Sequence, residues 1–180
     1  MSDGIKPTPP VPAPRAGQRF TFSGLVGSSD AALLAESALR YRAQFSILVV
    51  FCAQAQDAQR LSEEIPAFAP QLKTRLLPDW EILPYDQFSP HQDLVSERLA
   101  TLHAMLNGSC DIVLIPVTTA LQRLGPPQFL SGHTFFFKQG DRLNESALRL
   151  QLQQAGYDPV SAVMRPGEYS IRGGLIDLFP

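Results

Sequence analysis

The turn at residues 24–31, GLVGSSDA, has residue types and spacing close to those of a phosphate-binding loop. Such a P-loop follows the pattern G-x-x-x-x-G-K-[ST] between a strand and a helix. Counted from Gly24, Ser29 replaces the second glycine, Asp30 the lysine and Ala31 the hydroxyl residue that binds magnesium. A carboxylate at the lysine position would repel a β- or γ-phosphate. We therefore expect no ATP binding at this degenerate site, and we interpret Asp30 as a helix cap. The site comprises Gly24, Gly27, Ser29, Asp30 and Ala31.

The other polar residues form no recognisable catalytic or metal-binding pattern. Asp86, His91 and Asp93 lie close in sequence, but their spacing matches no metal site, and a polar loop before a helix accounts for them. The candidate nucleophiles lack a His or Asp arrangement that would activate them (Ser28, Ser29, Cys110). We expect no catalysis, no cofactor and no metal in this chain.

Three aromatic residues, Trp80, Tyr85 and Phe88, alternate with prolines in the loop at residues 77–90. Aromatic rings of this kind can stack on nucleic-acid bases. They can equally pack on the surface of their own domain, and the absence of neighbouring cations in the sequence favours packing.

Composition argues against nucleic-acid binding by this chain alone. The formal net charge is −2 over 180 residues, whereas binding to a phosphate backbone normally requires a basic face. From residue 128 onward, five Lys or Arg residues balance five Asp or Glu residues, so no basic stripe emerges there. The hydrophobic share of 44% is sufficient for a core.

The compartment suggested by the sequence is the cytoplasm. Cys52 and Cys110 lie in or beside apolar runs, as buried thiols in a reducing cytosol would. No stretch approaches the roughly 20 apolar residues of a membrane span. Residues 1–17 carry five of the sixteen prolines and no export-signal architecture, and we expect a disordered tail there.

Residues 18–127 predict an α/β domain with a mostly parallel sheet. Fully apolar runs at residues 47–52 and 111–116 are typical of strands covered on both faces. Shorter strands are expected at residues 18–23 and 73–77, and helices at residues 31–42 and 55–68.

A further helix should follow the aromatic loop. Ser89 can cap it, Pro90 suits its first position and Gln92 completes a capping box. An apolar stripe at helical spacing predicts the buried face, at Val95, Leu99, Leu102 and Leu106.

Residues 128–180 predict a second, α+β domain. A strand is expected at residues 134–138, then a helix capped by Asn144 and ended at Gly156. Two extended runs at residues 168–172 and 175–179 flank Gly173 and Gly174. Because the chain ends directly after a strand-like run, we expect this domain to be partial and the chain to be a fragment of a longer protein.

The stretch at residues 77–106 reads LPDWEILPYDQFSPHQDLVSERLATLHAML. It closely resembles the amino-terminal, UvrB-like region of the bacterial transcription-repair coupling factor family (Mfd), which reads W-E-x-L-P-Y-D-x-F-S-P-H-Q-D and continues to S-x-R-L. Residues 167–180 are similar to a second motif of that family, G-E-Y-x-x-R-G-x-L-x-D-L-F-P. The resemblance covers roughly residues 19–180.

This resemblance implies a degenerate RecA-like domain followed by a domain that docks on UvrA. Arg172 matches the motif arginine that is among the contacting residues in that family, and a planar guanidinium suits carboxylate recognition. Neighbours in the same block are further candidates for partner binding, namely Glu168, Tyr169 and Phe179. The parent protein would be an ATP-driven DNA translocase that displaces stalled RNA polymerase, through parts absent from this chain.

UvrB itself resembles the same region, but it carries an intact P-loop and a tyrosine-rich insert. This sequence has neither, and Ser170 stands where UvrB has a further arginine. These differences disfavour UvrB, and an enzyme of UvrB or helicase type is the alternative to recruitment. A structural remnant that holds the motor inactive, through contacts within the longer chain, is a third reading.

Overall fold

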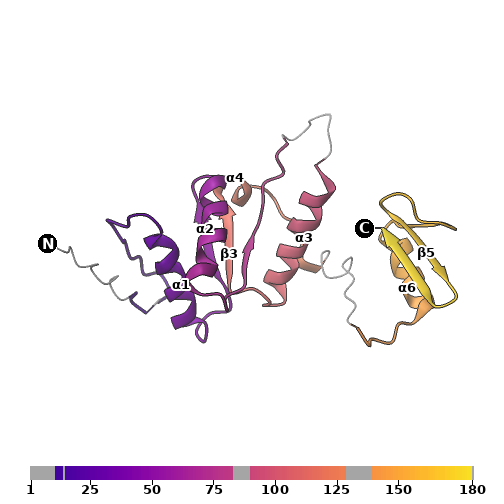
Figure 1. Cartoon of the computed structure of the whole chain (residues 1–180), viewed down its shortest axis with the longest axis horizontal. Coiled ribbons are helices and arrows are strands. Elements are labelled where there is room, and N and C mark those ends of the chain that lie inside the picture. The colour runs from indigo at the N-terminus through magenta and orange to yellow at the C-terminus, as the bar shows by residue number, and fades with distance from the viewer. Residues whose placement is uncertain (1–10, 14, 83–89, 129–138, 180) are drawn as a thin grey trace. The chain divides into compact units, whose positions relative to one another are not determined.

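The computed structural model describes residues 11–13, 15–82, 90–128 and 139–179. The chain divides into two compact units, residues 1–127 and residues 128–180 (Figure 1). No helix in the described part is long and apolar enough to cross a membrane.

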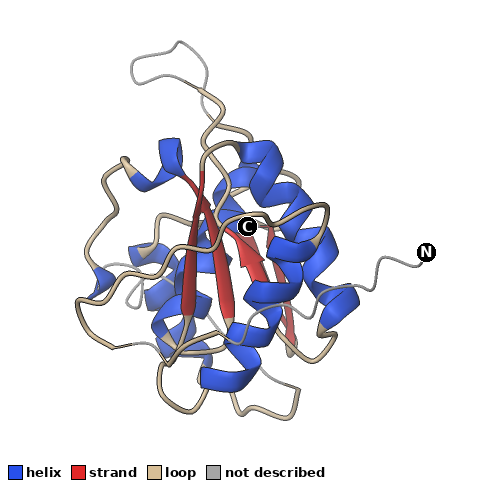
Figure 2. Cartoon of the chain, turned by 90° about the vertical axis from the view of Figure 1, so that its left-hand side faces the viewer, coloured by secondary structure: helices blue, strands red, loops and turns tan. Residues whose placement is uncertain are grey.

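A three-stranded parallel sheet forms the centre of the first unit. Its strands are β1 (Leu48–Cys52), β2 (Thr74–Leu76) and β3 (Ile112–Pro116), in the order β1-β3-β2. Every residue of β3 is buried, as its continuous apolar sequence predicts. Figure 2 shows the strands side by side with helices around them. The predicted α/β class with a parallel sheet is confirmed.

Successive residues of a strand point to opposite faces of the sheet, so each face needs its own covering helices. On one face, α1 (Ser29–Tyr41) and α2 (Ala55–Phe68) enclose a core that includes Ile112 and Leu114. On the other face, α3 (Gln92–Leu106) encloses Val113 and Ile115. A short helix, α4 (Val117–Ala120), follows β3 directly.

Strand β1 differs from its prediction because one face is open. Val49 is 39% exposed and Phe51 is 65% exposed. Among the described strands β1 pairs only with β3, and the α3-side core draws on β3 and Leu77 rather than on this part of β1. An apolar run therefore marked the strand correctly but overstated its coverage.

The strand predicted at residues 18–23 is wrong, because these residues form neither helix nor strand. Alternating apolar residues need a neighbouring strand to pair with, and Phe20 is instead 45% exposed. Of the tail expected to be disordered, residues 1–10 and 14 lie outside the described part. The carbonyl of Val11 accepts a hydrogen bond of 2.6 Å from the Tyr41 hydroxyl.

Helix α3 begins later and faces differently than predicted. It starts at Gln92, and His91 occupies the cap position, where its Nδ1 accepts from the Asp93 amide at 3.3 Å. Pro90 therefore precedes the cap, and Ser89 lies outside the described residues. Leu99 and Leu106 are 42% and 48% exposed, so the buried face is rotated from the predicted stripe. Its buried members are Arg98, Thr101 and Ala104.

The second unit packs one helix on a three-stranded sheet. Helix α6 (Glu145–Gln154) is capped by Asn144, whose Oδ1 accepts from the Ala147 amide at 3.0 Å. Gly156 ends it with a φ of 88°. The sheet has the order β4-β5-β6, with β4 (Asp158–Pro159), β5 (Glu168–Arg172) and β6 (Leu175–Phe179). The helix and the β5–β6 hairpin are confirmed, whereas the strand predicted at residues 134–138 lies outside the described part.

Candidate functional site

The segment with P-loop-like spacing leads into α1 without forming a cap through Asp30. Ser28 occupies the cap position and makes no side-chain cap hydrogen bond. Asp30 lies inside the first turn, where its Oδ1 accepts from the Ala31 amide at 2.8 Å. The Ser29 hydroxyl donates to the Val26 carbonyl at 2.5 Å. The interpretation of Asp30 as a cap is therefore wrong.

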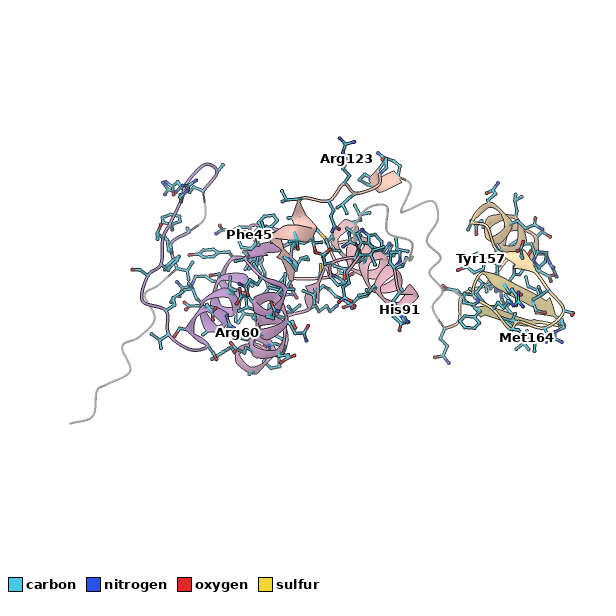
Figure 3. The ribbon with its side chains drawn as sticks, turned by 90° about the horizontal axis from the view of Figure 1, so that it is seen from above. Phe45, Arg60, His91, Arg123, Tyr157 and Met164 are labelled. Atoms are coloured by element: carbon cyan, nitrogen blue, oxygen red, sulfur yellow. The ribbon has the colours of Figure 1, made fainter. Side chains whose placement is uncertain are left out.

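Asp30 instead joins α1 to α2 through an ion pair with Arg60. Arg60 donates to both carboxylate oxygens, at 2.6 and 3.2 Å, and also to Glu64 at 2.8 Å. This bonding with Arg60 lowers the pKa of Asp30 and raises the pKa of Arg60. The guanidinium, labelled in Figure 3, is thus engaged by two carboxylates of its own unit. Nothing at this turn offers a phosphate an unpaired cation.

An open hollow of about 470 Å³ adjoins the Asp30–Arg60 pair. Its lining is mostly apolar and comes from residues 22–25, α1, the end of β1 and α2, including Leu25, Leu33, Phe51 and Leu61. The hollow lies where the carboxyl end of a parallel strand meets two helices, a common place for ligand binding. Its lining is mostly apolar and its Asp30 and Arg60 charges are paired with each other, so the hollow does not suit a nucleoside triphosphate.

Arg98 anchors the start of the aromatic loop. It is only 2% exposed, it donates to the Pro78 carbonyl, and its guanidinium lies 4.1 Å from the centre of the Trp80 ring. Thr101, one turn later, donates to the Leu76 carbonyl at 2.9 Å. Trp80 therefore packs on its own domain, and a cation does stand beside it. The other loop candidates lie outside the described residues (Tyr85, Asp86, Phe88).

Asp79 completes a partly buried polar group around Arg98. Its Oδ1 accepts from the Trp80 amide at 2.7 Å and from Gln122 Nε2 at 2.6 Å. Burial alone would raise the pKa of Asp79, but hydrogen bonds from Thr118, Gln122 and Trp80, with the charge of Arg98, outweigh it and lower that pKa. Burial lowers the pKa of Arg98, and the negative charge of Asp79 partly opposes this lowering. The group ties β2, α3 and the segment after α4 together.

The β5–β6 hairpin presents two unlike faces. On one face, the side chains pack with Leu148 and Leu152 of α6 and form the core of the unit. These strand residues are Tyr169, Ile171, Ile176 and Leu178. The opposite side, here called the helix-free face, consists of Glu168, Ser170, Arg172, Leu175, Asp177 and Phe179. Leu175 is 62% and Phe179 is 43% exposed there, and Arg172 is exposed beside Leu175.

Two of the predicted partner-binding residues have other roles in the structure. Tyr169 is 1% exposed and belongs to the core, so its side chain is not available for docking. Glu168 Oε2 accepts from the amides of Met164 and Arg165, at 2.8 and 2.9 Å, and these bonds lower its pKa. Arg172 and Phe179 remain as exposed candidates at opposite ends of the hairpin.

The described residues contain no group of three His, Cys, Asp or Glu side chains suited to a metal ion. His91 Nδ1 lies 3.4 Å from Asp93 Oδ2 at the start of α3, and Asp86 is outside the described part. Cys52 and Cys110 are both buried, and burial raises the pKa of each thiol.

Residues 135–180 match the model of the UvrB interaction domain family, so the second unit carries a domain of this class. The chain as a whole is 43% identical over 180 residues to the transcription-repair-coupling factor of Escherichia coli (strain K12), and it is a relative of that family. It is 45% identical over 135 residues to the factor of Haemophilus influenzae, covering 75% of this chain, and 31% identical over 172 residues to that of Mycobacterium tuberculosis, covering 92% of it. The chain spans 15%, 12% and 14% of the lengths of these relatives. The resemblance seen in the two sequence motifs is confirmed.

Proposed function

We propose that this chain is a recruitment module that binds UvrA and has no catalytic activity of its own. The observation that carries the proposal is the helix-free face, which exposes Arg172, Leu175 and Phe179 within the region that matches the UvrB interaction domain. Exposed apolar residues beside an arginine are typical of the energetically important part of a protein interface.

The first unit fits a degenerate RecA-like domain in this proposal. Asp30, at the lysine position of the P-loop pattern, is paired with Arg60, which supports a scaffold role over nucleotide hydrolysis. The longer protein would be an ATP-dependent DNA translocase of the cytoplasm that acts on stalled RNA polymerase. DNA and polymerase contacts would then be made by its other parts.

The Arg172→Ala variant tests the docking proposal directly. We expect the unsubstituted chain to bind purified UvrA and the variant to lose more than about 1 kcal/mol of binding free energy, roughly fivefold in Kd. Calorimetry or biolayer interferometry would measure this. Arg142→Ala is the matched control, because Arg142 is an exposed arginine of the same unit that lies outside the hairpin.

Three outcomes separate the readings. If only Arg172→Ala binds UvrA more weakly, the result supports the recruitment module with Arg172 in its interface. Equal binding by all three proteins would keep the function and remove Arg172 from it. Failure of the unsubstituted chain to bind would favour the structural remnant that acts through contacts within the longer protein.

A further inference from the structure

A loop crosses half of the helix-free face. Glu168 and Ser170 both belong to that face, and both bond to the preceding loop, Glu168 through the amides of Met164 and Arg165, and Ser170 through the Ser161 carbonyl at 3.5 Å. Ser170 alternates with Tyr169 and Ile171, which pack in the core with α6, yet it is only 3% exposed. The loop at residues 161–167, here called the covering loop, therefore accounts for its burial.

The covering loop is continuous with the open half of the face. The Gly167 amide donates to the Phe179 carbonyl at 2.9 Å, and Glu168 is the register partner of Phe179. Arg172 lies at the other end of β5, about 13 Å away at the rise of an extended strand. The loop thus adjoins one end of the face, and Arg172 marks the other.

The outward residues of the covering loop match the chemistry of that face. Met164, labelled in Figure 3, is 81% exposed, and Arg165 is exposed beside it. Among the described residues of this unit, Arg165 and Arg172 have no carboxylate within ion-pair distance, as is also true of Arg142, whereas Arg149 is paired with Glu145. Arg172 therefore lies at one end of a face on which Leu175 and Phe179 are exposed on either side of Asp177, and the covering loop with Arg165 adjoins the other end.

We propose that the covering loop completes the docking face, with Arg165 as a second partner-contacting arginine and Glu168 as the residue that positions the loop. This rests on the proposed binding to UvrA. The surface it would fit on UvrA has carboxylates facing the two arginines, apolar groups facing Leu175 and Phe179, and a hydrogen-bond donor facing Asp177. Glu168 acts through the loop backbone and need not touch the partner.

Hydrogen exchange on the unbound chain tests the positioning step without UvrA. Glu168→Ala removes the acceptor, and exchange of the Met164 and Arg165 amides should accelerate at least tenfold. Glu168→Gln keeps an acceptor oxygen and should restore part of the protection. Glu145→Ala removes a carboxylate that pairs with Arg149 and makes no bond to the covering loop, so this control should leave both amides unchanged. Unchanged protection in Glu168→Ala would overturn the positioning role.

A double-variant cycle with UvrA tests the contact step. Arg165→Ala should weaken binding about fivefold, and Glu168→Ala should weaken it by a smaller factor. If Glu168 acts only by placing Arg165 and its loop, the double variant should bind within twofold of Arg165→Ala alone. If the double variant instead weakens binding by the product of the two single effects, Glu168 contributes to binding independently of Arg165. That result would overturn this division of roles.

Failure of this inference differs from failure of the proposed function. Arg165→Ala could bind UvrA like the unsubstituted chain while Arg172→Ala binds weakly. That result would overturn the loop contact and leave the proposed recruitment in place. No binding by the unsubstituted chain would overturn both.

Discussion

Asp30 makes a tertiary contact from the position where the P-loop pattern has a lysine. At the lysine position of the P-loop pattern, the carboxylate binds Arg60 of the neighbouring helix instead of a phosphate. The Asp30 side chain therefore links α1 to α2.

The Asp30→Asn variant should be modestly less stable than the unsubstituted chain at neutral pH. Both partners are about a third exposed, 39% for Arg60 and 34% for Asp30, so solvent screens much of their attraction. Because the folded pKa of Asp30 is lowered, its stabilisation is complete above the ordinary value of 3.8 and disappears as pH falls through the lowered value.

Urea unfolding at pH 7 and at successively lower pH values would measure this difference. The gap between the two proteins should close on acidification, and Asp177→Asn, an exposed carboxylate without an ion pair in the described part, should show no such pattern. A gap that stays constant with pH would rule out the ion pair as its source.

Residue roles that depend on neighbours in the sequence could be predicted from it, whereas roles that depend on tertiary partners could not. Asn144 was predicted as a cap from its position alone, and the structure confirms it. Arg98 was missed, because an arginine inside a helix ordinarily points to water. The available signal was its place on the same helical face as Thr101 and Ala104, opposite the exposed Leu99.

At the scale of elements, helix α6 depends on its ends as well as on its buried face. Its only buried residues are Leu148 and Leu152, so a short helix of 10 residues gains little from packing over its remaining length. The Asn144 side chain satisfies one amide that would otherwise lack a partner in the first turn.

Asn144→Ala should cost about 1 kcal/mol of stability in the second unit. Hydrogen exchange of the α6 amides would report the loss, and Asn144→Ser should recover most of it. Gln151→Ala, at an exposed position within the same helix, is the control for helix propensity. A loss as large in Gln151→Ala would show that the cap is not the cause.

The fully buried strand β3 and the hairpin could be predicted from short-range pattern, since apolar continuity and a Gly-Gly turn are local signals. The open face of β1 and the rotated face of α3 could not. Both depend on which parts of the sheet the helices reach, and that information lies in contacts between distant segments. Strand β4 was also missed, because its two residues gain a partner only through β5.

For the whole molecule, the decisive question is whether the first unit binds nucleotide. We expect no measurable binding of a fluorescent ATP analogue at millimolar concentration, with or without Mg²⁺, because Asp30 opposes the phosphate charge and Arg60 is already paired. An intact P-loop ATPase would serve as the positive control in the same titration. Saturable binding by this chain would favour the alternative of a UvrB-type or helicase-like enzyme.

The open face of β1 has a colloidal consequence. Val49 and Phe51 expose apolar surface on a strand whose second edge is unpaired among the described strands, and such edges can recruit further chains. A net charge of −2 supplies little repulsion to oppose that contact. Solubility of the isolated chain should therefore depend on concentration and should be lowest near its pI of about 5.9.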